Sequence, residues 1–294
     1  MSEIEGEKPY KDSGIKEGDR IVEVGGRAIT CTADLTQCIN SSKGDNVQIK
    51  YVRDGKEYET NINPKKSRED EYKLGLWVRD AAAGVGTITF YEPSSGRFAA
   101  LGHGILDIDT DQLVTISKGE VVTANIVSVK KGAKGLPGEI KGSIENGQTI
   151  GEVGKNTSFG IYGSLTNTNA LKIDKSNTME IALKNEVKKG PAKIICAVEN
   201  GKKEEYDIEI QKIFLNNEYD NKSMIIKITD ERLLEKTGGI IQGMSGSPIV
   251  QDGKFVGAVT YVMVNDPTMR ICCICRTDDK ANEKSTMKNK LVTI

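Results

Sequence analysis

Histidine is nearly absent from this sequence. Its 294 residues include one histidine, His103, so any chemistry that requires an imidazole depends on that residue. Imidazole is the side chain that most often accepts the proton of a nucleophilic hydroxyl near neutral pH. A histidine-based catalytic site is therefore restricted to the surroundings of His103.

The sequence also lacks an excess of charge of either sign and a long apolar run. It carries 41 Lys and Arg against 42 Asp and Glu, so no overall field attracts a polyanion and nucleic acid is not expected as a partner. Residues 1–11 are polar and acidic, and no later window has the length of a membrane span. We therefore expect no signal or transmembrane segment in this chain.

The six cysteines do not follow the spacing of a disulfide framework. Cys272, Cys273 and Cys275 lie together, but three sulfurs with no histidine nearby make a poor zinc site. Cys31 and Cys38 are expected to be packing residues of the core. The cysteines therefore predict neither a metal nor another cofactor.

Glycine and β-branched residues indicate a mostly β protein. The 31 glycines punctuate short alternating runs rich in Val, Ile and Thr, a pattern typical of strands joined by tight turns. About eleven strands are predicted between residues 75 and 270, which suits two barrels or a sandwich. We expect two domains, because the chain is long enough for each to bury its own core.

Residues 1–66 have the pattern of a small βαββ unit. A strand runs through Ile21 and Val24, a helix capped by Thr32 extends to Ser41, and a hairpin turns at Asp54-Gly55. The unit, with its Gly14-to-Ile21 stretch, resembles the C-terminal part of a PDZ domain, a module that captures peptides as an added strand. The strand that should precede Gly14 is not recognisable, so this partial PDZ-like domain is expected to bind a peptide ligand weakly.

Residues 67–74 are charged and are predicted as a linker to a second domain at 75–270.

The most informative stretch of the second domain is Gly243-Met244-Ser245-Gly246-Ser247-Pro248, which precedes an apolar run. A serine between glycines before a strand is typical of a nucleophile, although a tight turn is the alternative. Since His103 also lies between two glycines, we predict that it is the general base for Ser245. Ser247, the competing nucleophile, is expected to form local hydrogen bonds.

Several segments together resemble the SpoIVB-type sporulation serine peptidases: Gly84–Tyr91, Gly102–Gly104, Gly135–Glu139 and Ile228–Pro248. The resemblance implies a PDZ domain followed by a chymotrypsin-like double β-barrel with catalytic His103, Asp230 and Ser245. It also implies an acyl-enzyme at Ser245, with the backbone N–H groups of Gly243 and Ser245 as the oxyanion hole. The implied substrate is a membrane-bound regulatory protein, cleaved outside the cytoplasm between the forespore and mother-cell membranes during sporulation signalling.

The acidic member of the triad has more than one interpretation. Asp230 matches the family pattern, but it also directly precedes a helix-like run that ends at Gly238 and therefore has the position of an N-cap. Asp107 and Asp109 follow His103 closely and are alternatives, unless they only form a turn. Geometry is needed to choose among them.

The sequence departs from the family in two places and from many chymotrypsin-like enzymes in a third. Met244 stands where many chymotrypsin-like enzymes have Asp, which excludes a salt bridge to a new N-terminus, and Tyr261 replaces a histidine. After Pro267 the resemblance ends, and 271–294 is an atypical C-terminal tail. Loss of the final strand is expected to leave an exposed sheet edge. An inactive PDZ-containing binding or regulatory protein is therefore the alternative function.

Overall fold

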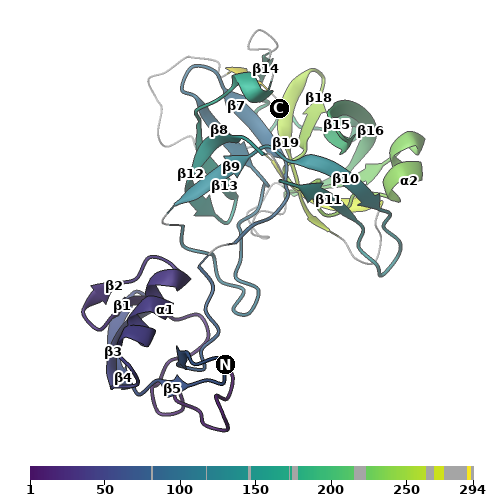
Figure 1. Cartoon of the computed structure of the whole chain (residues 1–294). Coiled ribbons are helices and arrows are strands. Elements are labelled where there is room, and N and C mark those ends of the chain that lie inside the picture. The colour runs from purple at the N-terminus through teal and green to yellow at the C-terminus, as the bar shows by residue number, and fades with distance from the viewer. Residues whose placement is uncertain are drawn as a thin grey trace. The chain divides into compact units, whose positions relative to one another are not determined.

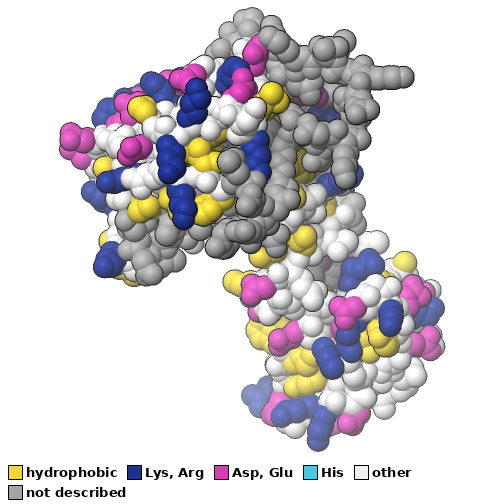
Figure 2. All heavy atoms as spheres, turned by 180° about the vertical axis from the view of Figure 1, so that it is seen from behind, with side chains coloured by type: hydrophobic (Ala, Val, Ile, Leu, Met, Phe, Trp, Pro, Cys, Tyr) yellow, Lys and Arg dark blue, Asp and Glu magenta, His cyan; other side chains and the backbone are white. Residues whose placement is uncertain are grey.

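The computed structural model describes residues 1–80, 82–116, 118–144, 147–171, 173, 178–214, 223–262, 268–274 and 290–292. The chain forms two compact units (Figure 1). One unit contains Met1–Gly84 with Asp107–Gln112, and the other contains Val85–Leu106 with Leu113–Ile294. Basic and acidic side chains both occur on each unit in Figure 2, in line with the balanced composition.

The first unit is a four-stranded antiparallel sheet with one helix. Its strands are β1 (Arg20–Val24), β2 (Arg27–Ala28), β3 (Val47–Arg53) and β4 (Lys56–Ile62), in the order β2-β1-β3-β4. Helix α1 (Thr32–Ser41) buries Leu35 and Ile39 in the core of this unit. The predicted helix is confirmed, as is the hairpin, where Asp54 and Gly55 both have positive φ.

The N-cap of α1 is Cys31, so the prediction that Thr32 caps this helix was wrong. The carboxylate of Asp34 accepts hydrogen bonds from the N–H groups of Thr30 and Cys31 at 2.9 and 3.3 Å. A side chain from the first turn thus reaches back to the residues before the helix, as in a capping box.

The segment predicted as a linker contains regular structure. Strand β5 (Lys65–Lys66) pairs with β6 (Tyr72–Lys73), and Leu74 is buried in the core of the first unit. A buried Leu74 ties the end of this segment to the first unit through the hydrophobic effect. The predicted domain boundaries themselves remain a proposal.

The second unit begins with a five-stranded antiparallel sheet. Its order is β7 (Ile88–Glu92), β8 (Arg97–Ala100), β13 (Gly160–Leu165), β12 (Thr149–Thr157) and β9 (Gly119–Val122). Phe98, Ile150 and Leu165 are buried in its core. Strands β10 (Asn125–Lys130) and β11 (Glu139–Ser143) form a separate hairpin. The short 3₁₀ helix Asn169–Leu171 follows β13.

The rest of the second unit is a closed six-stranded barrel. Its order is β15 (Gly190–Glu199), β16 (Lys202–Ile213), β17 (Met224–Ile228), β20 (Met269–Ile274), β19 (Lys254–Val262) and β18 (Pro248–Gln251). Helix α2 (Glu231–Thr237) follows β17, and its Leu233 joins the barrel core. The mostly β fold with a PDZ domain and a peptidase domain is confirmed. Within the described residues, one half of the peptidase domain is a closed barrel and the other an open sheet.

The expectation of an exposed edge in this barrel was wrong. Strand β20 lies between β17 and β19 and pairs with both, so the residues after Pro267 complete the barrel. Further along the predicted tail, β21 (Lys290–Leu291) pairs with β14 (Met179–Glu180), while residues 275–289 and 293–294 lie outside the described residues. A closed barrel has no unpaired strand, because its last strand bonds to the first.

No helix in the described part of the chain has both the length and the apolar character needed to cross a membrane.

Candidate active site

The predicted nucleophile lies in a tight loop that leads into β18. Gly243 and Gly246 have φ values of 96° and 94°, which side chains other than glycine rarely adopt. Met244, between them, is buried in the barrel core. The half-buried Ser245 donates a hydrogen bond from Oγ to the carbonyl oxygen of Thr260 at 3.2 Å. The loop thus buries Met244 and leaves Ser245 partly accessible.

Two N–H groups of this loop have no partner among the described residues. These are the N–H groups of Gly243 and Ser245, the two predicted oxyanion donors. The other three are bonded: Met244 N–H donates to Ile241 at 3.2 Å, Gly246 N–H to Val259 at 2.8 Å, and Ser247 N–H to Met244 at 3.0 Å. Backbone donors without a hydrogen-bond partner are uncommon in folded proteins. Two such N–H groups close together can stabilise a developing oxyanion.

His103 lies in a loop directly after β8. Leu101 and Gly102 both have φ of 70°, and such a value strains a bulky residue like leucine. The Nδ1 atom of His103 is 3.0 Å from the carbonyl oxygen of Gly104. Because a carbonyl can only accept, Nδ1 is the donor in this hydrogen bond, and the neutral form of the ring then has its lone pair on Nε2. That tautomer is the one a general base acting through Nε2 requires.

The structure brings the histidine loop and the serine loop into contact. Thr87 N–H donates to the Ser245 carbonyl at 3.0 Å, and the Thr87 carbonyl accepts from Leu101 N–H at 3.2 Å. A Cβ added to Gly102 would lie 2.8 Å from Cγ2 of Thr260, the residue whose carbonyl bonds to Ser245 Oγ. His103 therefore follows a glycine that packs against β19, the strand whose Thr260 carbonyl accepts the hydrogen bond from Ser245.

Ser247 is completely buried, and its hydroxyl has no hydrogen-bond partner among the described residues. The expectation that this hydroxyl bonds locally was wrong, although the Ser247 N–H does donate to Met244. A hydroxyl without exposed surface cannot meet a substrate in this conformation. Of the two serines in the loop, only Ser245 is accessible to substrate here.

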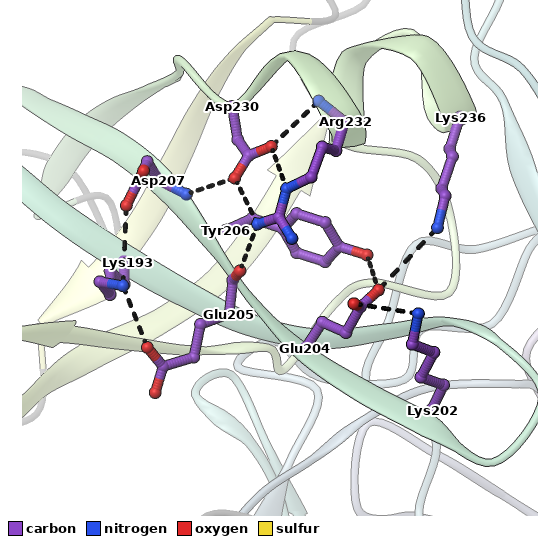
Figure 3. Close-up of polar contacts among 9 residues, drawn as sticks. All are labelled: Lys193, Lys202, Glu204, Glu205, Tyr206, Asp207, Asp230, Arg232 and Lys236. Carbon is purple, nitrogen blue, oxygen red and sulfur yellow. Dashed lines mark hydrogen bonds and ion pairs between the residues drawn. The ribbon is translucent and has the colours of Figure 1, made fainter.

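Asp230 is the N-cap residue of α2 (Figure 3). One carboxylate oxygen accepts from the Arg232 N–H at 3.0 Å and from Arg232 Nε at 3.1 Å. The other accepts from Arg232 Nη2 at 2.8 Å and from the Asp207 N–H at 3.2 Å. The hydrogen bond from the Arg232 side chain is the main reason that the pKa of Asp230 is below its ordinary 3.8. Both oxygens are thus engaged within this helix and strand, and these contacts give no support to a triad role.

Asp107 and Asp109 form a turn within the first compact unit. The Oδ1 atom of Asp107 accepts from the Asp109 N–H, the Thr110 N–H and the Thr110 hydroxyl, each at 3.1 Å. Asp109 pairs with Arg79. The backbone N–H of Asp109 is the main reason that the pKa of Asp107 is lowered. These contacts match the turn interpretation of both residues.

The Asp230→Ala variant is expected to be about 1 kcal/mol less stable than the wild type at pH 7, because it loses an N-cap. The pKa of Asp230 in the folded state is below its ordinary 3.8, so the ionised carboxylate stabilises the fold at pH values above 3.8. This stabilisation, and with it the difference between variant and wild type, should be lost as the pH falls from about 3.8 through the lowered pKa. Urea unfolding at several pH values measures it. Asp207→Ala is the matched control, because its carboxylate is 68% exposed and reaches Lys193 only at 3.8 Å.

Asp230→Asn separates the two roles of this residue, since asparagine caps helices as well as aspartate does. We expect Ser245 in this variant to react with a fluorophosphonate within about threefold of the wild-type rate. A loss of about 10⁴-fold, as for a missing triad acid, would instead assign Asp230 to the triad.

Thr87 and Thr260 are the residues that sequence reasoning missed. Thr87 lies inside the Gly84–Tyr91 motif, but nothing in that motif indicates a contact with Ser245. Thr260 follows the apolar run of β19 and is buried. The bonds that join them to Ser245 use their backbone groups, whose partners depend on chain folding rather than on residue type.

A closed β-barrel whose serine loop contacts a histidine loop resembles one half of a chymotrypsin-like serine peptidase, whereas the predicted second barrel is an open sheet in the described residues. The model of the SpoIVB peptidase S55 family matches residues 70–276, and that of the PDZ domain matches residues 1–63. The chain therefore belongs to the SpoIVB peptidase S55 family. The family resemblance inferred from the sequence is confirmed.

Curated relatives are similar over shorter stretches. "Probable periplasmic serine endoprotease DegP-like" of Pseudomonas putida is 27% identical over 146 residues, which is 49% of this chain and 28% of that protein. "Serine protease Do-like HtrA" of Lactococcus lactis subsp. cremoris is 38% identical over 63 residues, which is 21% of this chain and 16% of that protein. A protein of Mesorhizobium japonicum whose name describes a zinc metalloprotease is 31% identical over 85 residues, which is 29% of this chain and 23% of that protein. The matched region is thus less than a third of each relative.

Proposed function

We propose that this protein cleaves a peptide bond in a protein substrate through an acyl-enzyme at Ser245, with His103 as the general base. The observation that carries the proposal is the contact between the two glycine-flanked loops through Thr87 and Thr260. These loops are far apart in the sequence, so the fold itself must hold them together. Nucleophilic catalysis by serine needs a base close to the hydroxyl, and the contact between the two loops supports that placement.

In the proposed reaction the Ser245 hydroxyl turns from the Thr260 carbonyl, to which it donates in this structure, toward His103. The lone pair on His103 Nε2 accepts the Ser245 proton while Oγ attacks the scissile carbonyl. The unpaired N–H groups of Gly243 and Ser245 stabilise the resulting oxyanion. His103 then gives its proton to the leaving amine, and water hydrolyses the acyl-enzyme by the reverse sequence. These steps require no metal or cofactor.

Family membership and the PDZ domain support a finer proposal about substrate and place. We propose a membrane-bound sporulation regulator as the substrate, cleaved in the space between the forespore and mother-cell membranes. The periplasmic relative from Pseudomonas putida supports a site of action outside the cytoplasm. The PDZ domain is proposed to bind a peptide ligand, because such domains capture extended peptides beside a strand.

A fluorophosphonate probe tests the proposed nucleophile. Folded protein is expected to become covalently labelled at Ser245, and Ser245→Ala is expected to lose all labelling at this site. Ser247→Ala is the matched control in the same loop and should label like the wild type, because its hydroxyl is buried. Peptide mass spectrometry identifies the modified residue.

Failure of the folded wild type to label would contradict the proposal. That outcome would instead favour the alternative, a catalytically inactive PDZ-containing binding or regulatory protein.

A further inference from the structure

Thr87 occupies the position between the histidine loop and the serine loop. Its N–H and C=O groups bond to Ser245 and Leu101, and its side chain makes a third bond. The half-buried hydroxyl of Thr87 donates to the carbonyl oxygen of Gly243 at 3.2 Å. The two backbone bonds require no particular side chain, whereas the third requires a hydroxyl at this position.

The carbonyl that receives this bond belongs to the peptide group between the two unpaired donors. The Gly243 N–H lies immediately before that peptide group, and the Ser245 N–H lies immediately after it. The N–H of this peptide group belongs to Met244 and donates to the Ile241 carbonyl at 3.2 Å. The Thr87 hydroxyl therefore holds the opposite side of the same peptide group.

Glycine makes this orientation easy to lose. Gly243 has a φ of 96° and no side chain to restrict the rotation of the peptide group that follows it. Rotation would turn the Gly243 carbonyl dipole away from Thr87 and change the directions of the N–H groups beside it. Oxyanion stabilisation depends on donors that are oriented before the reaction begins.

We infer that Thr87 is a positioning residue for the oxyanion hole, and that its hydroxyl acts by fixing the orientation of the Gly243–Met244 peptide group. The inference rests on the proposed function, since it assumes that the N–H groups of Gly243 and Ser245 serve as oxyanion donors. Thr87 itself contacts neither the substrate nor the reacting atoms in this arrangement. Its effect passes through the loop that it orients.

Two variants separate the hydroxyl from the rest of the side chain. Thr87→Val keeps the shape and both backbone bonds but removes the donor, whereas Thr87→Ser keeps the donor and removes a methyl group. Hydrolysis of the activated ester p-nitrophenyl acetate gives kcat and KM, and fluorophosphonate labelling gives an independent rate. Both are measured on the full chain, with thermal unfolding recorded in parallel.

We expect Thr87→Val to lower kcat and the labelling rate by about tenfold to a hundredfold, with KM within about twofold. The loss should be smaller than that for removal of an oxyanion donor, because the donors remain present but less well oriented. Thr87→Ser should restore both rates to within about threefold of the wild type. A merely structural role would not predict rescue by the smaller residue that keeps the hydroxyl.

The possible results are distinguishable. Wild-type rates in Thr87→Val, with Ser245→Ala inactive, would overturn this inference and leave the proposed function intact. Equal losses in Thr87→Val and Thr87→Ser would also overturn it, because the hydroxyl would then be irrelevant. Absence of labelling in the folded wild type would overturn both proposals.

Discussion

The His103→Ala variant is expected to react with a fluorophosphonate at least about 10⁴ times more slowly than the wild type. His103 is the one histidine of the chain, so no other imidazole can replace it. Without a base, the Ser245 hydroxyl keeps its proton and is a weak nucleophile. The rate of covalent labelling, followed by gel fluorescence, gives this ratio directly.

Stability measurements distinguish a lost base from a damaged fold. His103 is half-buried, and a typical single substitution costs about 1 kcal/mol of unfolding free energy, so we expect a loss of about that size. Urea unfolding of His103→Ala should therefore remain cooperative. Labelling at more than a tenth of the wild-type rate would remove His103 from the mechanism.

The Gly246→Ala variant is expected to lose about 3 kcal/mol or more of unfolding free energy. A φ of 94° already strains an alanine. An added Cβ would lie 2.6 Å from the backbone nitrogen of Leu101 and would also clash with the carbonyl oxygen of Thr87. These atoms are backbone, so relief requires the histidine and serine loops to move apart. Urea unfolding and labelling of Ser245 should therefore both be affected.

Gly253→Ala is the matched control for this effect. Gly253 turns the hairpin between β18 and β19 with a φ of 77°, but a Cβ there would meet no atom within 4 Å. It should lose only about 1 kcal/mol, the backbone cost alone, and label normally. Equal losses in the two variants would mean that close packing of the loops contributes nothing.

Local elements were predictable because their causes are local. The helix at 32–41 and the hairpin at Asp54-Gly55 follow from apolar spacing and from residues that tolerate positive φ, and both are observed. The helix cap was missed because Thr32 and Asp34 are both suitable capping residues, and the observed bonds come from Asp34. The local backbone conformation decides which of two neighbouring side chains reaches the N–H groups before the helix.

Barrel closure was not predictable from the residues after Pro267. Pairing of β20 with both β17 and β19 depends on the register of strands from distant parts of the chain. No family pattern was recognised after Pro267, although the match to the family model extends to residue 276 and includes β20. A β ladder is formed by backbone groups that most residue types supply. The expected exposed edge is therefore replaced by a paired strand.

Asp230 shows the limit of pattern reasoning at the site itself. Its sequence position suits a triad acid and a helix cap equally well, and the observed carboxylate bonds are those of a cap and an ion pair. Ser247 was likewise expected to form local hydrogen bonds, whereas its hydroxyl is buried with no partner among the described residues. Burial and partner choice are properties of the folded chain.

By itself, the sequence determined which side chains could carry out the chemistry, because one histidine and one serine between glycines leave few choices of base and nucleophile. It also determined the mostly β class, since strand and turn preferences are local. Only the tertiary structure decided that Thr87 joins the two loops, that two N–H groups of the serine loop find no partner in the described part of the chain, and that Asp230 caps α2. The physical reason is that each of these features depends on which groups come close enough to the backbone to form a hydrogen bond. Packing of the whole unit sets those distances.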